Sequence, residues 1–206
     1  MRYVITFFIS LLCFLTLYFF QIDNIFIIGL VIILILAAVM FPMLKALFWE
    51  TNIEKIERFL LKNKKNPNFY IVYAMANEND EDVKNLTEKL LQKYPQKSRQ
   101  ALLKTGEALY FKNITAAKSE VDHIKPLSHR LYYQAIILIE DGDMEGADEV
   151  IEKITTKWME NALLAEREKK LNNLSNAKKY AKKAKQHSKG VQRYLLHKTY
   201  EREFDL

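Results

Sequence analysis

Two long apolar runs open the chain, and short amphipathic segments separated by polar turns fill the rest. The runs cover about residues 3–21 and 25–46, and Lys45 is the only charged residue within them. Each is long enough to cross a hydrocarbon core of about 30 Å as a helix. The pattern predicts a transmembrane helical hairpin over residues 1–49 and a separate helical domain over 51–206.

The charges that flank the two predicted spans indicate an orientation. Arg2 precedes the first span and Lys45 closes the second, whereas the connecting QIDN contains no Lys or Arg. The positive-inside rule then places both termini in the cytoplasm, and we expect a bacterial inner (cytoplasmic) membrane protein. A cleaved signal peptide is the alternative, but no small-residue cleavage site follows the first run and a second run comes at once.

A capping pattern marks the start of the polar part. Thr51 with Glu54 three residues later has the form of a capping box, so a helix is predicted from there. Ile53, Ile56 and Leu60 give that helix an apolar face at helical spacing. The sequence KNKKN then indicates a solvated break.

A repeat with a period near 30 residues follows this break. The sequences KNITAA, GDMEGA and NNLSNA share an Asn or Asp, an apolar residue and an alanine, and the alanines Ala117, Ala147 and Ala177 are 30 residues apart. Such a period is typical of stacked helical hairpins, with Asn or Asp capping the second helix and alanine permitting close helix contact. Few glycines and prolines also favour helix. The predicted hairpins cover 67–94, 95–125, 126–155 and 156–187, and a last helix covers 190–204.

This pattern resembles the tetratricopeptide repeat (TPR). In the best-matching segment, 128–161, Ala135 and Leu138 match the small and large positions of the family's first helix, Gly142-Asp143 forms the turn, and Ala147 is the small residue of the second helix. The units are 28–31 residues long rather than 34, and Leu131 replaces an aromatic residue. The resemblance, which covers about residues 65–190, implies an α-solenoid. With the two apolar runs, the predicted fold is all-α: two transmembrane helices, then about four TPR-like hairpins plus a terminal helix.

The sequence EDGDMEGADEVIE, residues 140–152, also resembles a calcium-binding loop. Asp141, Asp143, Glu145 and Glu152 occupy ligand positions of an EF-hand, with Gly146 at its glycine position. The same turn recurs in KNITAA and NNLSNA almost without acids, so the acids are not the reason for the turn. We therefore expect Gly142 to end one helix, Asp143 to cap the next, and no metal to bind.

Catalytic motifs are missing from the sequence. It contains no nucleophile elbow, phosphate-binding glycine loop, dinucleotide fingerprint or H-E-x-x-H. The single cysteine, Cys13, lies within the first apolar run, and no histidine pairs with another histidine or cysteine at metal-ligand spacing. The prediction is a protein that is not an enzyme and needs no cofactor.

Repeat domains of this class bind other proteins on their concave surface. We therefore predict a scaffold or adaptor that binds a still unidentified partner protein. The candidate groove residues come from the first helices of the hairpins: Arg99, Lys104, Tyr110, Arg130, Tyr133 and Gln134.

The last 36 residues carry a charge equal to the whole net charge of +6, with nine Lys and Arg against three acids. This basic surface is a solvated helix face, a contact for anionic lipid or a contact for an acidic partner, and nucleic acid is an unlikely partner. The alternative function is a small integral subunit or assembly factor of a larger bacterial membrane complex, with the basic helices contacting anionic lipid or RNA. The candidate basic residues are Lys178, Lys179, Lys182, Lys183, Lys185, Lys189 and Arg193.

Overall fold

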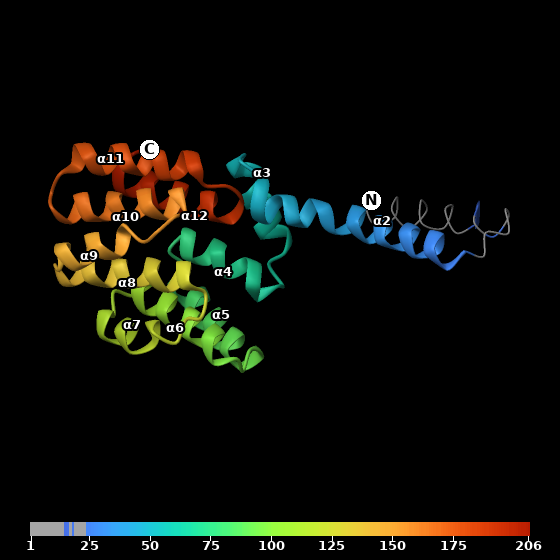
Figure 1. Cartoon of the computed structure of the whole chain (residues 1–206), viewed down its shortest axis with the longest axis horizontal. Helices are drawn as coiled ribbons and strands as arrows, with labels where there is room; N and C mark the ends of the chain where they lie inside the picture. Colours follow the sequence, from blue (N-terminus) through green and yellow to red (C-terminus); the bar gives the residue numbers. More distant parts are fainter. Residues whose placement is uncertain (1–14, 17, 19–23) are drawn as a thin grey trace.

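The computed structural model describes residues 15, 16, 18 and 24–206, and these residues are all-α, without a strand. α2 (Ile25–Leu44) continues into a π-helical turn, η1 (Lys45–Trp49), and projects away from the other helices (Figure 1). Together they form a 25-residue apolar helix, the one helix among the described residues that is long and apolar enough to cross a membrane. The predicted first span, 3–21, lies outside the described residues except for 15, 16 and 18.

The rest of the chain forms short helices that pack in sequence order. Each of the four predicted hairpin ranges contains two consecutive helices, and the predicted last helix coincides with α12. The elements are α3 (Ile53–Lys62), α4 (Pro67–Ala76), α5 (Asp80–Lys93), α6 (Lys97–Tyr110), α7 (Ile114–Val121), α8 (Leu127–Asp141), α9 (Met144–Ile151), α10 (Lys157–Lys170), α11 (Leu174–His187) and α12 (Gly190–Phe204).

The four hairpins share one turn. A residue with positive φ ends the first helix, and the next residue, an Asn or Asp, caps the second helix with its side chain. In the third hairpin Gly142 has φ 87°, and Asp143 Oδ1 accepts a hydrogen bond from the Gly146 amide at 2.9 Å. The predicted turn is thus confirmed in EDGDMEG. The pairs are Glu78 with Asn79, Lys112 with Asn113, Gly142 with Asp143, and Asn172 with Asn173.

The predicted cap of α3 is wrong by one residue. Asn52, not Thr51, is the N-cap, and its Oδ1 accepts a hydrogen bond from the Lys55 amide at 2.9 Å. The amides of Thr51 and Asn52 instead donate to Glu50 Oε1, at 3.0 and 3.1 Å. This local turn moves the start of the helix past Thr51.

The repeated alanines lie where the two helices of a hairpin cross. Ala117, Ala147 and Ala177 are completely buried, and Val83 holds the same place in the first hairpin. Each belongs to an apolar cluster that joins its own hairpin to a neighbouring helix. The core is therefore a succession of clusters that follows the hairpins around the molecule.

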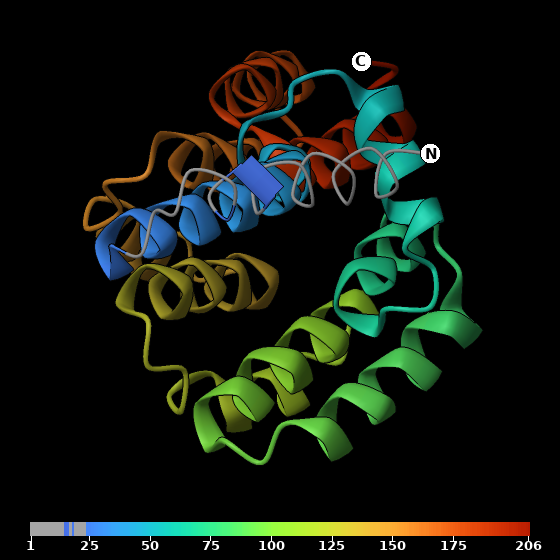
Figure 2. The same cartoon turned by 90° about the vertical axis from the view of Figure 1, so that its right-hand side faces the viewer.

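α12 closes this succession into a ring (Figure 2). It packs on α11 and also returns to η1, α3 and α4, the first elements of the domain. Tyr194 lies at the junction, in one buried cluster with Ile56, Leu60 and Ala76. The predicted boundary between anchor and domain is therefore crossed by contacts.

Hydrogen bonds of Tyr194 and Arg202 reinforce the closure. The Tyr194 hydroxyl donates to Glu57 Oε1 at 2.9 Å and accepts from Asn77 Nδ2 at 3.0 Å. Further along α12, the Arg202 guanidinium donates to the Ala76 carbonyl at 2.5 Å and pairs with Glu78 at 3.0 Å. α12 thus contacts the end of α4 both at Tyr194 and, further along α12, at Arg202.

Candidate binding cavity

A cavity of about 730 Å³ lies inside the ring. Its walls come from the first helices of the hairpins, α4, α6, α8 and α10, and from α12. Cavities of this size bind small molecules or a few side chains of a partner. Because α12 supplies one wall, the cavity depends on the closure of the ring.

Aromatic side chains form much of this wall. The Tyr132 ring lies 5.6 Å from that of Trp158 and 5.7 Å from that of Tyr133, measured between centroids. Tyr110 and Tyr200 also line the cavity. Rings of this kind offer large apolar contact areas and faces that attract cations.

Three tyrosine hydroxyls of this wall have no hydrogen-bond partner among the described residues: those of Tyr132, Tyr133 and Tyr200. Tyr200 is only 1% exposed. Burial raises the pKa of all three, and the carboxylates of Glu166 and Glu203 raise that of Tyr200 further. All three therefore remain protonated at neutral pH and can donate a hydrogen bond to an occupant.

Carboxylates gather at the end of the cavity near the hairpin turns. Lys169 binds both Glu166 and Glu203, at 2.7 and 2.8 Å, and Lys170 binds Glu140 at 2.9 Å. The side chain of Glu166 is 26% exposed. Burial raises its pKa, although Lys169 opposes this effect. The same end holds Glu78, which pairs with Arg202, and Asp80, which accepts a hydrogen bond from Tyr110 at 2.6 Å.

The cavity lining is therefore aromatic with an acidic excess. Glu78, Asp80, Glu140, Glu166 and Glu203 line it, together with only two permanently charged cations, Lys112 and Arg202. Lys169 and Lys170 neutralise part of this excess from outside the lining. Such an arrangement suits an occupant with apolar groups and at least one positive charge.

The structure brings together two of the six predicted groove residues, since Tyr110 and Tyr133 both line the cavity. The others lie elsewhere. Arg99 stacks over the Tyr94 ring, 3.4 Å from its centroid, and Lys104 pairs with Glu120 at 2.9 Å. Gln134 donates to Asp122 at 2.9 Å, and Arg130 is half-buried outside the cavity lining.

The predicted basic surface divides into two groups. Lys178, Lys179, Lys182 and Lys183 are exposed along the outside of α11, whose alanines are buried. Lys189 is exposed at the start of α12, whereas Lys185 and Arg193 are half-buried at the junction. Arg193 donates hydrogen bonds to the carbonyls of Lys185, Ser188 and Thr51 and so joins the end of α11 to the segment before α3.

Sequence reasoning missed Tyr132, Trp158, Glu166 and Tyr200. Tyr132 precedes the predicted Tyr133 and was available from the same helix. Trp158 lies 30 residues after Ser128, so the repeat pattern offers no aromatic residue at the equivalent place in α8. Nothing in the repeat pattern pointed to Tyr200, because α12 is not part of a hairpin.

Among residues 15, 16, 18 and 24–206, no cluster of His, Cys, Asp or Glu is arranged to hold a metal ion. The cavity chemistry is that of binding through aromatic contact, hydrogen bonding and charge. No protein-family model, curated protein or solved structure matches the chain.

Proposed function

We propose that this chain is a membrane-anchored adaptor that binds a segment of a partner protein in the cavity of a TPR-like helical domain. The apolar helix formed by α2 and η1 serves as the anchor, in a bacterial inner membrane with the domain in the cytoplasm. Lys45 at the end of α2 supports this orientation. The equal turns and buried alanines of the hairpins support TPR-like repeats.

The observation that carries the proposal is the wall of Tyr132, Tyr133, Trp158 and Tyr200 inside the ring. Three tyrosines whose hydroxyls have no described partner line one cavity with a tryptophan, and aromatic residues of this kind dominate protein-binding hot spots. The carboxylates Glu140, Glu166 and Glu203 add attraction for a positive charge. The partner segment therefore carries an apolar or aromatic anchor next to Lys or Arg.

A peptide-display selection on the full chain, held in lipid nanodiscs, tests this proposal. We expect selected peptides to combine an aromatic or large aliphatic residue with a basic one. Trp158→Ala should weaken their binding by about tenfold or more, as loss of a hot-spot aromatic does. Tyr180→Ala, on the half-buried side of α11 away from the cavity lining, is the matched control.

Two results would reject the proposal. One is a selection without enrichment, and the other is a set of peptides whose binding is unaffected by Trp158→Ala. Binding of a small aromatic cation but of no peptide would also reject the adaptor function, because it would make the cavity a small-molecule site.

A further inference from the structure

A second hollow, of about 650 Å³, lies outside the ring between the α3–α4 loop and the end of α5. Its polar lining consists of Lys62, Asn63, Lys64, Lys65, Asn66 and Lys93, and we call it the lysine crevice. The sequence here is KNKKN, for which the hydrophobic pattern predicts only a solvated break between helices. Four ammonium groups and no carboxylate therefore surround one hollow.

Several lysines of this protein pair with carboxylates, but among the described residues the four lysines of the crevice do not. Lys104, Lys118 and Lys170, for example, each pair with a carboxylate of another helix. In the part of the chain that the structure describes, Lys62, Lys64, Lys65 and Lys93 form no ion pair. Aromatic faces lie near two of them, with Lys64 Nζ 5.2 Å from the Tyr70 centroid and Lys93 Nζ 5.5 Å from that of Tyr94. The charge of the crevice is uncompensated.

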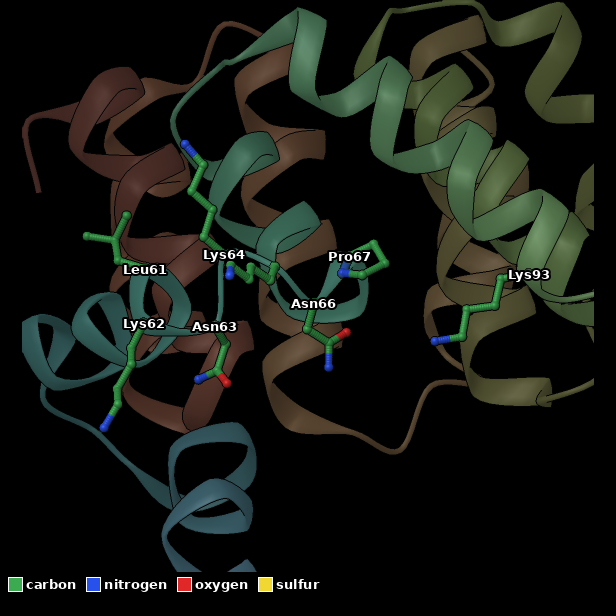
Figure 3. A pocket seen from close by; sticks show the side chains of 8 residues that line it. Leu61, Lys62, Asn63, Lys64, Asn66, Pro67 and Lys93 are labelled. Atoms are coloured by element: carbon green, nitrogen blue, oxygen red, sulfur yellow. The ribbon is translucent and has the colours of Figure 1, made fainter. Parts of the chain in front are cut away.

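An amide group is also available in the crevice. Asn66 Oδ1 accepts from Asn68, but Asn66 Nδ2 has no hydrogen-bond partner among the described residues. In Figure 3 the labelled side chains of Lys62, Asn63, Asn66 and Lys93 all extend towards the same side. Ammonium and amide donors around one hollow suit a phosphate group.

The crevice lies at the end of the domain from which α2 emerges. The start of α4 and the end of α5 are at the same end of the ring as the start of α12, where Gly190 contacts the segment after η1 (Figure 1). In Figure 3 the ribbon of that segment leaves on the side towards which these side chains extend. Leu61 beside the crevice is 44% exposed, and Phe48 and Trp49 of η1 are 59% and 55% exposed. Exposed aromatic residues at the end of an apolar helix are typical of the headgroup region.

We propose that the lysine crevice binds the phosphate-bearing headgroup of an anionic phospholipid in the membrane that α2 spans. This inference rests on the proposed membrane anchorage, but it is independent of the cavity inside the ring. Juxtamembrane lysines are attracted to an anionic leaflet, and the attraction falls off within a Debye length. The lipid contact would fix the orientation of the ring relative to the membrane surface.

Lysine accessibility in nanodiscs tests this proposal with the full chain. The protein is placed in discs of phosphatidylcholine alone and in discs that also contain phosphatidylglycerol, and acetylation of each lysine by an amine-reactive ester is followed by mass spectrometry. We expect Lys62, Lys64, Lys65 and Lys93 to react several-fold more slowly in the anionic discs. Lys178 and Lys179 on the outside of α11 should react equally in both, and a general slowing that includes them would overturn the proposal.

Further measurements distinguish a lipid headgroup from free phosphate as the ligand of the crevice, and from a failure of the membrane anchorage. Equal acetylation of the four lysines in both discs overturns the lipid site, whereas failure of the chain to enter any disc overturns the anchorage itself. Soluble glycerol phosphate, added to the zwitterionic discs, should give no protection at millimolar concentration. Protection equal to that in the anionic discs would show a site for free phosphate instead.

A charge-neutral variant gives a second, independent readout. We expect the triple variant Lys62→Gln, Lys64→Gln, Lys65→Gln to retain about tenfold less phosphatidylglycerol than the wild type when extracted from mixed discs. The matched control is Lys178→Gln, Lys179→Gln, Lys182→Gln, which removes the same charge from α11 and should retain the wild-type amount. Equal losses in the two triple variants would show a general charge effect and overturn the site.

Discussion

The backbone amide of Gly190 donates a hydrogen bond to the carbonyl oxygen of Glu50 at 2.7 Å. Gly190 begins the last helix, and Glu50 is the first residue after the apolar helix formed by α2 and η1. One contact thus joins the start of α12 to the end of that apolar helix. The ring, its inner cavity and the position of the lysine crevice all depend on this junction.

Gly190→Ala should disrupt the junction. Gly190 has φ 58°, and a Cβ atom there would lie 1.9 Å from the carbonyl oxygen of Leu47. We expect a loss of roughly 2–4 kcal/mol in the free energy of unfolding, from backbone strain plus the clash. Thermal unfolding and limited proteolysis near Leu47 measure it.

The matched control for that variant is Gly106→Ala. Gly106 lies within α6, and its nearest neighbour to an added Cβ is the Tyr133 hydroxyl at 3.7 Å, an ordinary contact. Alanine favours the helix there by about 0.5–1 kcal/mol. Equal effects of the two substitutions would contradict the tight junction.

Tyr194→Phe should loosen the closure of the ring. The Tyr194 hydroxyl is fully buried and bonds both Glu57 and Asn77, so its removal leaves two polar groups of α3 and α4 without this partner. We expect a loss of about 1–2 kcal/mol in the free energy of unfolding. Tyr180→Phe removes a hydroxyl for which no such pair of bonds exists, and it should change stability little. An unchanged denaturation midpoint for Tyr194→Phe would count against the closure.

The turns offer a paired test of backbone strain. Lys112 and Gly142 hold the same place in successive hairpins, with φ 57° and 87°. Because a Cβ atom costs about 1 kcal/mol in this conformation, Lys112→Gly should raise stability and Gly142→Ala should lower it by about that amount. Chemical denaturation of both variants measures the two changes. Changes of the same sign would contradict the shared turn geometry.

His197 should make stability pH-dependent. Burial lowers its pKa, and the nearby ammonium of Lys185 lowers it further. The folded protein therefore binds the imidazole proton more weakly than the unfolded chain, so stability is complete above the unfolded pKa of about 6.5 and falls as the pH drops below it. His197→Asn should lose less stability than the wild type between about pH 7.5 and 5.5. His187→Asn, at an exposed position, is the control and should behave as the wild type.

The hairpins were predictable from the sequence because their signals are local. An Asn or Asp cap, a preceding turn residue and an alanine four positions later fix one unit, and Asp143 with Ala147 illustrate it. The prediction that Thr51 caps α3 failed because another local signal competes with it. Glu50 and Asn52 form a turn that the capping-box pattern does not include.

The closure of the ring was not predictable from local signals. α12 is apolar on several sides, with Tyr194, Leu196, Tyr200 and Phe204 all buried, so its periodicity did not show which helix each face contacts. The wall of the cavity that α12 supplies depends on this contact. Tyr133 could be placed from its own hairpin, whereas Tyr200 became a cavity residue only through the return of α12 to α4.

The central claim, that the cavity inside the ring binds a partner protein, is tested most directly by crosslinking in intact cells. A photoreactive amino acid is placed at Trp158 in the cavity and, separately, at Lys179 on the outside of α11. The account predicts a discrete crosslinked product from position 158 that disappears when Glu166→Lys reverses a cavity charge, and no such product from position 179. A product that is the same from both positions, or none from position 158, would contradict it.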